Sequence, residues 1–270
     1  YNTVGNSTIY AKWTGTSITL PTPTKTGYTF GGWYSDSGLT KKVGDGGSSY
    51  TPTSSLTLYA KWTINSYNVT YNYSQNGGTS ATKTTATVNY GSSIDLSPTA
   101  TKAGWTFVGW NTNKDATVGL TSLNMSTSNV TLYAIYRKEA VTLTAKFNGN
   151  GATLSSTNNL TCTLPAVYNN ASQQASCNVS APTITRSGYN IIGYNTSASS
   201  TTNNSSYNAS SKVLTLTNSN NNSTWYAITS KTITITFNKN GASTQTNASG
   251  TAVSDTTVTR TCTMYNTETT

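Results

Sequence analysis

Short runs in which large side chains alternate with small or polar ones recur along this chain, and the clearest is TLYAKW at residues 57–62. Alternation with a period of two residues is typical of a half-buried β-strand. Related runs lie at residues 8–13, 131–136 and 224–229, and each follows a turn rich in Asn or Ser. A motif that returns along a chain indicates an array of similar modules, so we interpret this one as the closing strand of a repeating unit.

A second pattern precedes three of these closing strands. It begins with a Pro, reaches a Gly six residues later and leads into an aromatic-rich run, as at Pro21 and Gly27, Pro98 and Gly104, and Pro182 and Gly188. Equal spacing in three places is not expected by chance. The aromatic runs predict a further strand in each repeat.

Other β-runs end in Asn-Gly turns. Residues 69–73, 141–147 and 233–237 have strand character, and Asn76-Gly77, Asn150-Gly151 and Asn240-Gly241 follow them. An Asn-Gly pair tolerates positive φ and predicts a hairpin or tight turn. Helical periodicity is not convincing anywhere in the chain. We therefore expect a mainly β fold, a tandem array of small modules with little helix.

These patterns divide the chain into five segments. We interpret residues 1–13 as the C-terminal remnant of a preceding repeat, 14–62 as a short repeat, 63–136 as a full repeat, 137–229 as a divergent full repeat and 230–270 as the start of a truncated one. We expect the sequence to be an excerpt from a longer polypeptide. The short repeat has no room between Trp13 and Ile18 for an opening strand pair, so it is either a reduced module docked on its neighbour or a module completed by a strand from elsewhere.

The composition favours an extracellular β-rich protein. Charged residues make up 9% of the chain, against roughly 25% in ordinary soluble proteins, and His is absent. The 6 Trp and 18 Tyr residues lie in periodic motifs, which argues against disorder. Lys and Arg outnumber Asp and Glu by 16 to 7, but they are scattered singly and form no stripe for nucleic acid. No apolar run is long enough to span a membrane.

The order of these motifs resembles the Listeria-Bacteroides repeat, also called the internalin-type B-repeat. Residues 63–136 match along nearly their whole length, through Asn-Gly-Gly at 76–78, Tyr-Gly-Ser at 90–92 and PTATKAGWTFVGW at 98–110. Residues 137–229 diverge, because Tyr194 replaces the motif Trp and Ile228-Thr229 replaces Lys-Trp. The resemblance implies small β-grasp-like modules in large secreted or wall-attached bacterial surface proteins. It implies no general enzymatic activity, so no catalytic residue and no cofactor are expected.

Two of the three cysteines are expected to form a disulfide. Aligned on the shared Pro, Cys177 takes the place of Ser93, and Cys162 falls near Ala86 across a longer connection. A disulfide across this insertion suits an oxidising, extracellular setting. Cys262 lies in Thr-Cys-Thr as Cys162 does, so it is unpaired in this fragment and its partner is expected beyond Thr270.

Candidate chemistry is otherwise sparse. The 7 acidic residues are spread over different modules, which disfavours the paired carboxylates of a glycosidase. With no His and no Cys-x-x-Cys spacing, a zinc site is not expected. Asp45, in Gly-Asp-Gly-Gly, weakly resembles a calcium-binding turn but lacks further oxygen ligands, and we interpret it as a loop residue.

The aromatic residues are the strongest candidates for ligand binding. Trp33, Tyr34 and Trp110 either form the small core of each module, which we favour, or stack against a sugar. The function predicted is a non-enzymatic stalk or fibre segment of a bacterial cell-surface or extracellular protein. The alternative is a glycan-binding adhesin. The partners expected are neighbouring modules or other copies of the chain, and host or cell-wall glycan.

Overall fold

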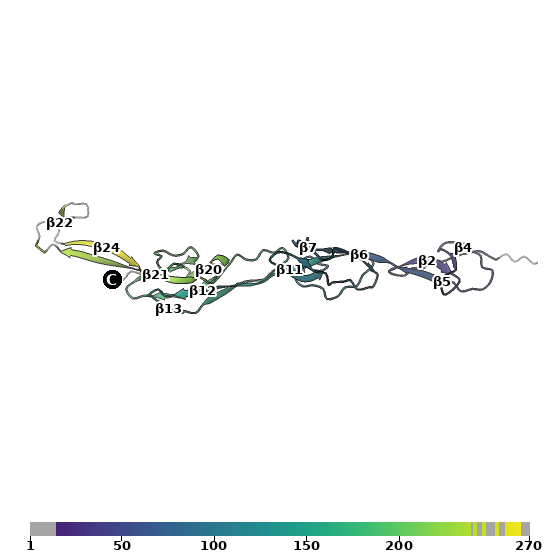
Figure 1. The fold of residues 1–270 in the computed structure, drawn as a ribbon, viewed down its shortest axis with the longest axis horizontal. Helices are drawn as coiled ribbons and strands as arrows, with labels where there is room; N and C mark the ends of the chain where they lie inside the picture. The colour runs from purple at the N-terminus through teal and green to yellow at the C-terminus, as the bar shows by residue number, and fades with distance from the viewer. Residues whose placement is uncertain (1–14, 239, 242–244, 247–251, 254–256, 266–270) are drawn as a thin grey trace, which may run out of the picture. The chain divides into compact units, whose positions relative to one another are not determined.

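The computed structural model describes residues 15–238, 240–241, 245–246, 252–253 and 257–265. These residues form strands and one short 3-10 helix, Asn218–Asn220, so the expected mainly β fold class is confirmed. The chain has two compact units (Figure 1). Unit 1 contains residues 1–137 together with 168–170, and unit 2 contains residues 138–167 and 171–270.

The first part of unit 1 is a small antiparallel sheet with the order β3-β2-β5. Its strands are β2 (Tyr28–Tyr34), β3 (Lys42–Gly44) and β5 (Tyr59–Ile64). A separate pair joins β1 (Ile18–Thr19) to β4 (Ser49–Tyr50). The closing motif of the short repeat therefore lies in β5, which is hydrogen-bonded to the aromatic strand β2.

The second part of unit 1 is a mixed sheet with the order β10-β11-β6-β8. Its strands are β6 (Ser66–Asn72), β8 (Thr85–Asn89), β10 (Thr106–Asn111) and β11 (Val130–Lys138). The opening strand β6 and the closing strand β11 are parallel neighbours, and the other pairs are antiparallel. Two short strands, β7 (Ser80–Ala81) and β9 (Ala100–Thr101), pair beside the sheet, and β15 (Val167–Tyr168) pairs with β11.

Unit 2 repeats this order as β14-β12-β21-β18. Its strands are β12 (Val141–Asn148), β14 (Leu160–Leu164), β18 (Asn190–Asn195) and β21 (Thr224–Asn238), with β12 and β21 parallel. The pair β13 (Thr153–Leu154) and β17 (Ile184–Thr185) corresponds to β7 and β9. A further sheet, absent from the preceding repeat, has the order β16-β20-β19, from β16 (Ser176–Ser180), β19 (Tyr207–Asn208) and β20 (Val213–Thr217).

Strand β21 serves two repeats. Its first half closes the divergent repeat against β18, and its second half pairs with β24 (Thr257–Tyr265) without a break after Thr229. The remaining pair is β22 (Gln245–Thr246) with β23 (Ala252–Val253). A closing strand thus runs directly into the opening strand that follows it.

A glycine before each motif aromatic bends the aromatic strand. The ladder shifts register next to Gly32, Gly109 and Gly193, whose φ values are 104°, 146° and 142°. A Cβ atom at Gly193 would collide with Asn203 and Tyr207, so only glycine fits. The bulge turns the next residue, Tyr194, into the core.

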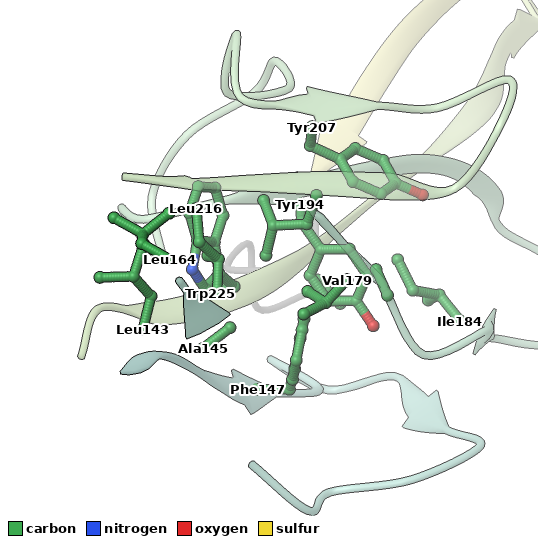
Figure 2. Packing of buried hydrophobic residues seen from close by; sticks show 13 residues of the cluster. Leu143, Ala145, Phe147, Leu164, Val179, Ile184, Tyr194, Tyr207, Leu216 and Trp225 are labelled. Carbon is green, nitrogen blue, oxygen red and sulfur yellow. The ribbon is translucent and has the colours of Figure 1, made fainter. Parts of the chain in front are cut away.

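Each full repeat encloses one hydrophobic core. The unit 2 core includes Phe147, Tyr194 and Trp225, and Figure 2 shows these rings among aliphatic side chains from several strands. Tyr194 makes edge contacts with Phe147 and Tyr207 at centroid distances of 5.2 and 5.3 Å. The corresponding core in unit 1 contains residues of β6, β10 and β11, among them Tyr71, Trp110 and Tyr136.

Candidate functional site

The motif aromatic side chain is hydrogen-bonded to the motif proline in all three repeats. Trp33 Nε1 donates to the Pro21 carbonyl at 2.8 Å, Trp110 Nε1 to Pro98 at 2.6 Å and the Tyr194 hydroxyl to Pro182 at 3.0 Å. The two residues are twelve positions apart each time. A buried ring whose polar atom has a partner is well accommodated in a core, which explains why Tyr can replace Trp here.

The structure places the three candidate sugar-stacking residues in different surroundings. Trp110 is 1% exposed and Tyr34 is 8% exposed, so both belong to the interior. Trp33 is half-buried, and its ring lies edge-on to Phe30 at 5.5 Å. Of the three, Trp33 alone keeps a substantial part of its ring accessible.

A basic side chain stacks on an aromatic ring at the glycine turn of each repeat. The distances from cation to ring centroid are 3.9 Å for Lys25 over Tyr28, 3.9 Å for Lys102 over Trp105 and 3.8 Å for Arg186 over Tyr189. The intervening glycines, Gly27, Gly104 and Gly188, have φ values between 74° and 77°. A residue with positive φ closes this turn, which brings the cation over the ring. Sequence reasoning missed this pair, although a basic residue two positions before each Gly and an aromatic residue after it could have revealed it.

Asn169 is fully engaged within unit 1. It is 8% exposed, its Oδ1 accepts the Tyr136 amide at 3.1 Å, and its Nδ2 donates to the carbonyls of Lys114 at 3.1 Å and Ala116 at 2.9 Å. The Asn169 amide donates to the Tyr136 carbonyl at 2.8 Å, and the Asn169 carbonyl accepts from Lys102 Nζ. One residue therefore satisfies backbone groups of the closing strand and of the loop after β10.

The asparagine of the Asn-Gly turn contacts the same loop. Asn76 is 3% exposed, and its Nδ2 donates to the carbonyls of Lys114 and Ala134, both at 2.9 Å. In unit 2, Asn150 Nδ2 donates to Ala198 at 2.8 Å and to Ala227 at 3.4 Å. The turn motif predicted from sequence thus also links the turn to the closing strand.

The site around Asn169 is a polar pocket for an amide. Burial lowers the pKa of Lys102 and raises the pKa of Tyr136 to about 12, because both charged forms lose hydration. The groups that contact Asn169 are an ammonium, a backbone N–H and backbone carbonyls, which hold an amide but supply neither a nucleophile nor a carboxylate pair.

Cys162 and Cys177 form a disulfide in unit 2. Their Cα atoms are 6.0 Å apart, and the bond joins β14 to β16. It therefore links the main sheet to the additional three-stranded sheet. Cys262 is exposed on β24, opposite Ile233, and the partner predicted for it lies outside the described residues.

The acidic residues give no metal site within the described part of the chain. No group of three or more His, Cys, Asp or Glu side chains lies close enough there to hold an ion. Asp45 Oδ1 is 2.7 Å from Lys42 Nζ, so its carboxylate is paired with an ammonium. Within the described residues, no helix is long and apolar enough to cross a membrane.

Fold and motifs together define a tandem array of β-modules whose opening and closing strands are parallel neighbours. Residues 1–61 and 67–135 match the Listeria-Bacteroides repeat domain, and these two stretches are Listeria-Bacteroides repeats. The family suggested by the sequence motifs is thereby confirmed.

Relatives that share this region are much longer than the matched segment. Internalin H of Listeria monocytogenes is 37% identical over 142 residues, which is 48% of this chain and 24% of that protein. A protein of Evansella cellulosilytica described as a membrane protein is 36% identical over 137 residues, covering 49% of this chain and 19% of its own length. A glycine-rich membrane protein of the same organism is 34% identical over 137 residues, covering 50% and 15%. No solved structure matches.

Proposed function

We propose that this chain is a non-enzymatic structural and interaction segment of a bacterial cell-surface or extracellular protein, with its repeats acting as a stalk. The observation that carries the proposal is the hydrogen bond from the motif aromatic to the motif proline in all three repeats. Residues that recur in the motif are engaged in internal contacts, which a load-bearing module requires. The similarity to Internalin H supports a location at the cell surface.

The sheet order supports a β-grasp-like module. In both full repeats the opening and closing strands are parallel and central, as in β10-β11-β6-β8. The connection that crosses the sheet in the repeat of unit 1 contains the short strands β7 and β9, and its described residues contain no helix. We therefore assign these repeats to a β-grasp-like fold whose crossing segment is an irregular β-rich loop.

Strand pairing between copies is a second function favoured by one observation. The closing strand β11 has β10 on one side and β6 on the other, whereas its counterpart β5 pairs only with β2 among the described residues. Near this edge, Ile18 is 49% and Leu56 40% exposed, and both line a groove with Leu58. A strand from a second copy of the chain would cover these apolar groups and pair with the edge.

Pulling a single chain by its two ends tests the stalk. Repeats with separate cores should unfold in discrete steps under load, because each core loses its packing cooperatively. Gradual extension without steps would contradict a load-bearing role.

A binding experiment separates the stalk from the glycan-binding adhesin. The purified chain is titrated with bacterial wall fragments and with host-type glycans at physiological salt. We expect no saturable binding that depends on Trp33, the most accessible of the three candidate rings. Saturable binding that is lost in Trp33→Ala and kept in Tyr59→Ala, a variant of another exposed aromatic, would replace the stalk by an adhesin.

A further inference from the structure

Unit 2 contains a groove that corresponds position by position to the Asn169 site of unit 1. Arg186 and Tyr189 take the places of Lys102 and Trp105, since each pair flanks the glycine turn of its repeat. Thr229 takes the place of Tyr136 at the end of the closing motif. The groove is lined by Gly151, Thr153, Ile184, Thr185, Arg186 and Tyr189.

Glycine positions support the correspondence. A Cβ atom at Gly77 would lie 3.1 Å from Asn170 Oδ1 and 3.3 Å from Lys102 Nζ, so this turn glycine borders the Asn169 site. A Cβ atom at Gly151 would lie 3.5 Å from the guanidinium of Arg186. In both repeats, therefore, the Asn-Gly turn and the basic side chain face the same space.

Strand register brings a matching segment to the groove. In unit 1, β15 contains Tyr168, and Asn169 follows it and pairs with Tyr136 through its amide. In unit 2, β24 ends with Tyr265 opposite Ser230 of β21. Continuing this antiparallel register by one residue places position 266 opposite Thr229, and that residue is an asparagine. The dipeptide Tyr-Asn thus follows the second strand in both places.

We propose that Asn266, which lies outside the described residues, inserts its side chain into the groove at Arg186. Its Oδ1 accepts the Thr229 amide, and its Nδ2 donates to the carbonyls of Ala198 and Ser200, the counterparts of Lys114 and Ala116. Arg186, which is held by a 3.0 Å hydrogen bond to the Thr229 hydroxyl, binds the Asn266 carbonyl as Lys102 binds that of Asn169. An asparagine suits this role because its amide is both an acceptor and a double donor.

The proposal makes a single asparagine the link between successive repeats. Asn169 and Asn266 each follow the second strand of one repeat and engage the closing strand of the repeat before it. A repeat of this type is therefore completed by the residue that the next repeat supplies. The link goes beyond a stalk function and does not depend on it.

Amide hydrogen exchange on the whole chain tests the link. We expect Asn266→Ala to accelerate exchange of the Thr229 amide by about tenfold, because a buried donor loses its acceptor. Asn169→Ala is the positive reference, with the same effect expected at the Tyr136 amide. Asn190→Ala is the matched control, since Asn190 is exposed on β18 and should leave the Thr229 amide unchanged.

Two results would overturn the proposal. The first is an unchanged Thr229 amide in Asn266→Ala together with a faster Tyr136 amide in Asn169→Ala. The second is equal acceleration at Thr229 in Asn266→Ala and Asn190→Ala, which would indicate a general loss of order. Asn266→Asp supplies an acceptor without the donors, so it should keep protection at Thr229 to a larger extent than Asn266→Ala.

Discussion

Single residues of the repeat motif are chosen for hydrogen bonding as well as for size. The Trp and Tyr rings at the same motif position both reach a proline carbonyl, through an indole N–H at Trp110 and a phenol O–H at Tyr194. A Phe of similar volume would fill the core and leave that carbonyl without its donor. The divergent repeat has therefore changed its motif aromatic while keeping its function.

Removing the hydroxyl of Tyr194 should destabilise unit 2. We expect Tyr194→Phe to lower the free energy of unfolding by about 1–2 kcal/mol, because the buried Pro182 carbonyl loses its partner. Chemical denaturation of the whole chain measures the change. Tyr189→Phe is the control, since its ring lies half-buried under Arg186 and should keep that contact. Equal losses in the two variants would argue against the hydrogen bond.

Buried tyrosines should make the protein sensitive to alkali. Burial raises the pKa of Tyr136 to about 12 and also raises the pKa of Tyr194, whereas an unfolded chain titrates near pH 10. The stabilisation is complete below about pH 10 and is lost as the pH rises towards 12, because the unfolded chain releases the protons first. For Tyr136 the displacement corresponds to about 2.7 kcal/mol.

Denaturation curves at several pH values measure this effect. Stability of the native chain should fall between about pH 10 and 12, and the fall should be smaller in Tyr136→Phe, which has no phenol to ionise. The comparison between the two proteins removes the contribution of lysines, which both share. Parallel curves for the two would show that Tyr136 does not carry the effect.

At the scale of the elements, the alternating patterns predicted the strands far better than their arrangement. TLYAKW and the Pro-Gly-aromatic spacing are local signals, and they correspond to β5 and to the aromatic strands β2, β10 and β18. Parallel pairing of β6 with β11 joins Val69 to Val130, and no local pattern encodes a contact so distant in sequence. The extra β16-β20-β19 sheet was missed because its strands lie in polar insertions.

The Asn169 site was hidden from sequence reasoning for a related reason. Asn169 is one of many asparagines in an Asn-rich chain, and its partners are backbone groups of Tyr136, Lys114 and Ala116. Backbone groups carry no sequence signature. The motif aromatics, by contrast, were correctly favoured as core residues, since Trp110 and Tyr34 are buried.

The disulfide between β14 and β16 should stabilise the divergent repeat. Cys162 and Cys177 are 15 residues apart, and closing a loop of this size contributes about 3 kcal/mol in the chain-entropy model. We expect the double variant Cys162→Ser, Cys177→Ser to lose about this amount in denaturation experiments. Cys262→Ser is the control and should have little effect, because Cys262 is exposed. Two free thiols at positions 162 and 177, detected by mass analysis without reductant, would contradict the bond itself.

At the scale of the whole molecule, the short repeat differs from the full ones in a way that favours assembly. In the full repeat of unit 1, β6 runs along residues 130–133 of the closing strand and covers Leu132, which is fully buried. The corresponding residues of the short repeat are 56–59, where Leu56 is 40% and Tyr59 40% exposed. An edge with accessible apolar side chains and unpaired backbone groups is a site for strand addition.

Sedimentation over a range of concentrations tests this assembly. We expect the native chain to associate as its concentration rises, and Leu56→Lys to weaken association by at least about tenfold, because a charge at a strand edge disfavours pairing. Val118→Lys is the matched control, since Val118 is 64% exposed in a loop of the following repeat and gains the same charge. If the native chain stays monomeric at every concentration, or if both variants dissociate equally, the edge at residues 56–59 does not pair copies of the chain. Selective dissociation of Leu56→Lys would instead make the short repeat the place where one array joins another.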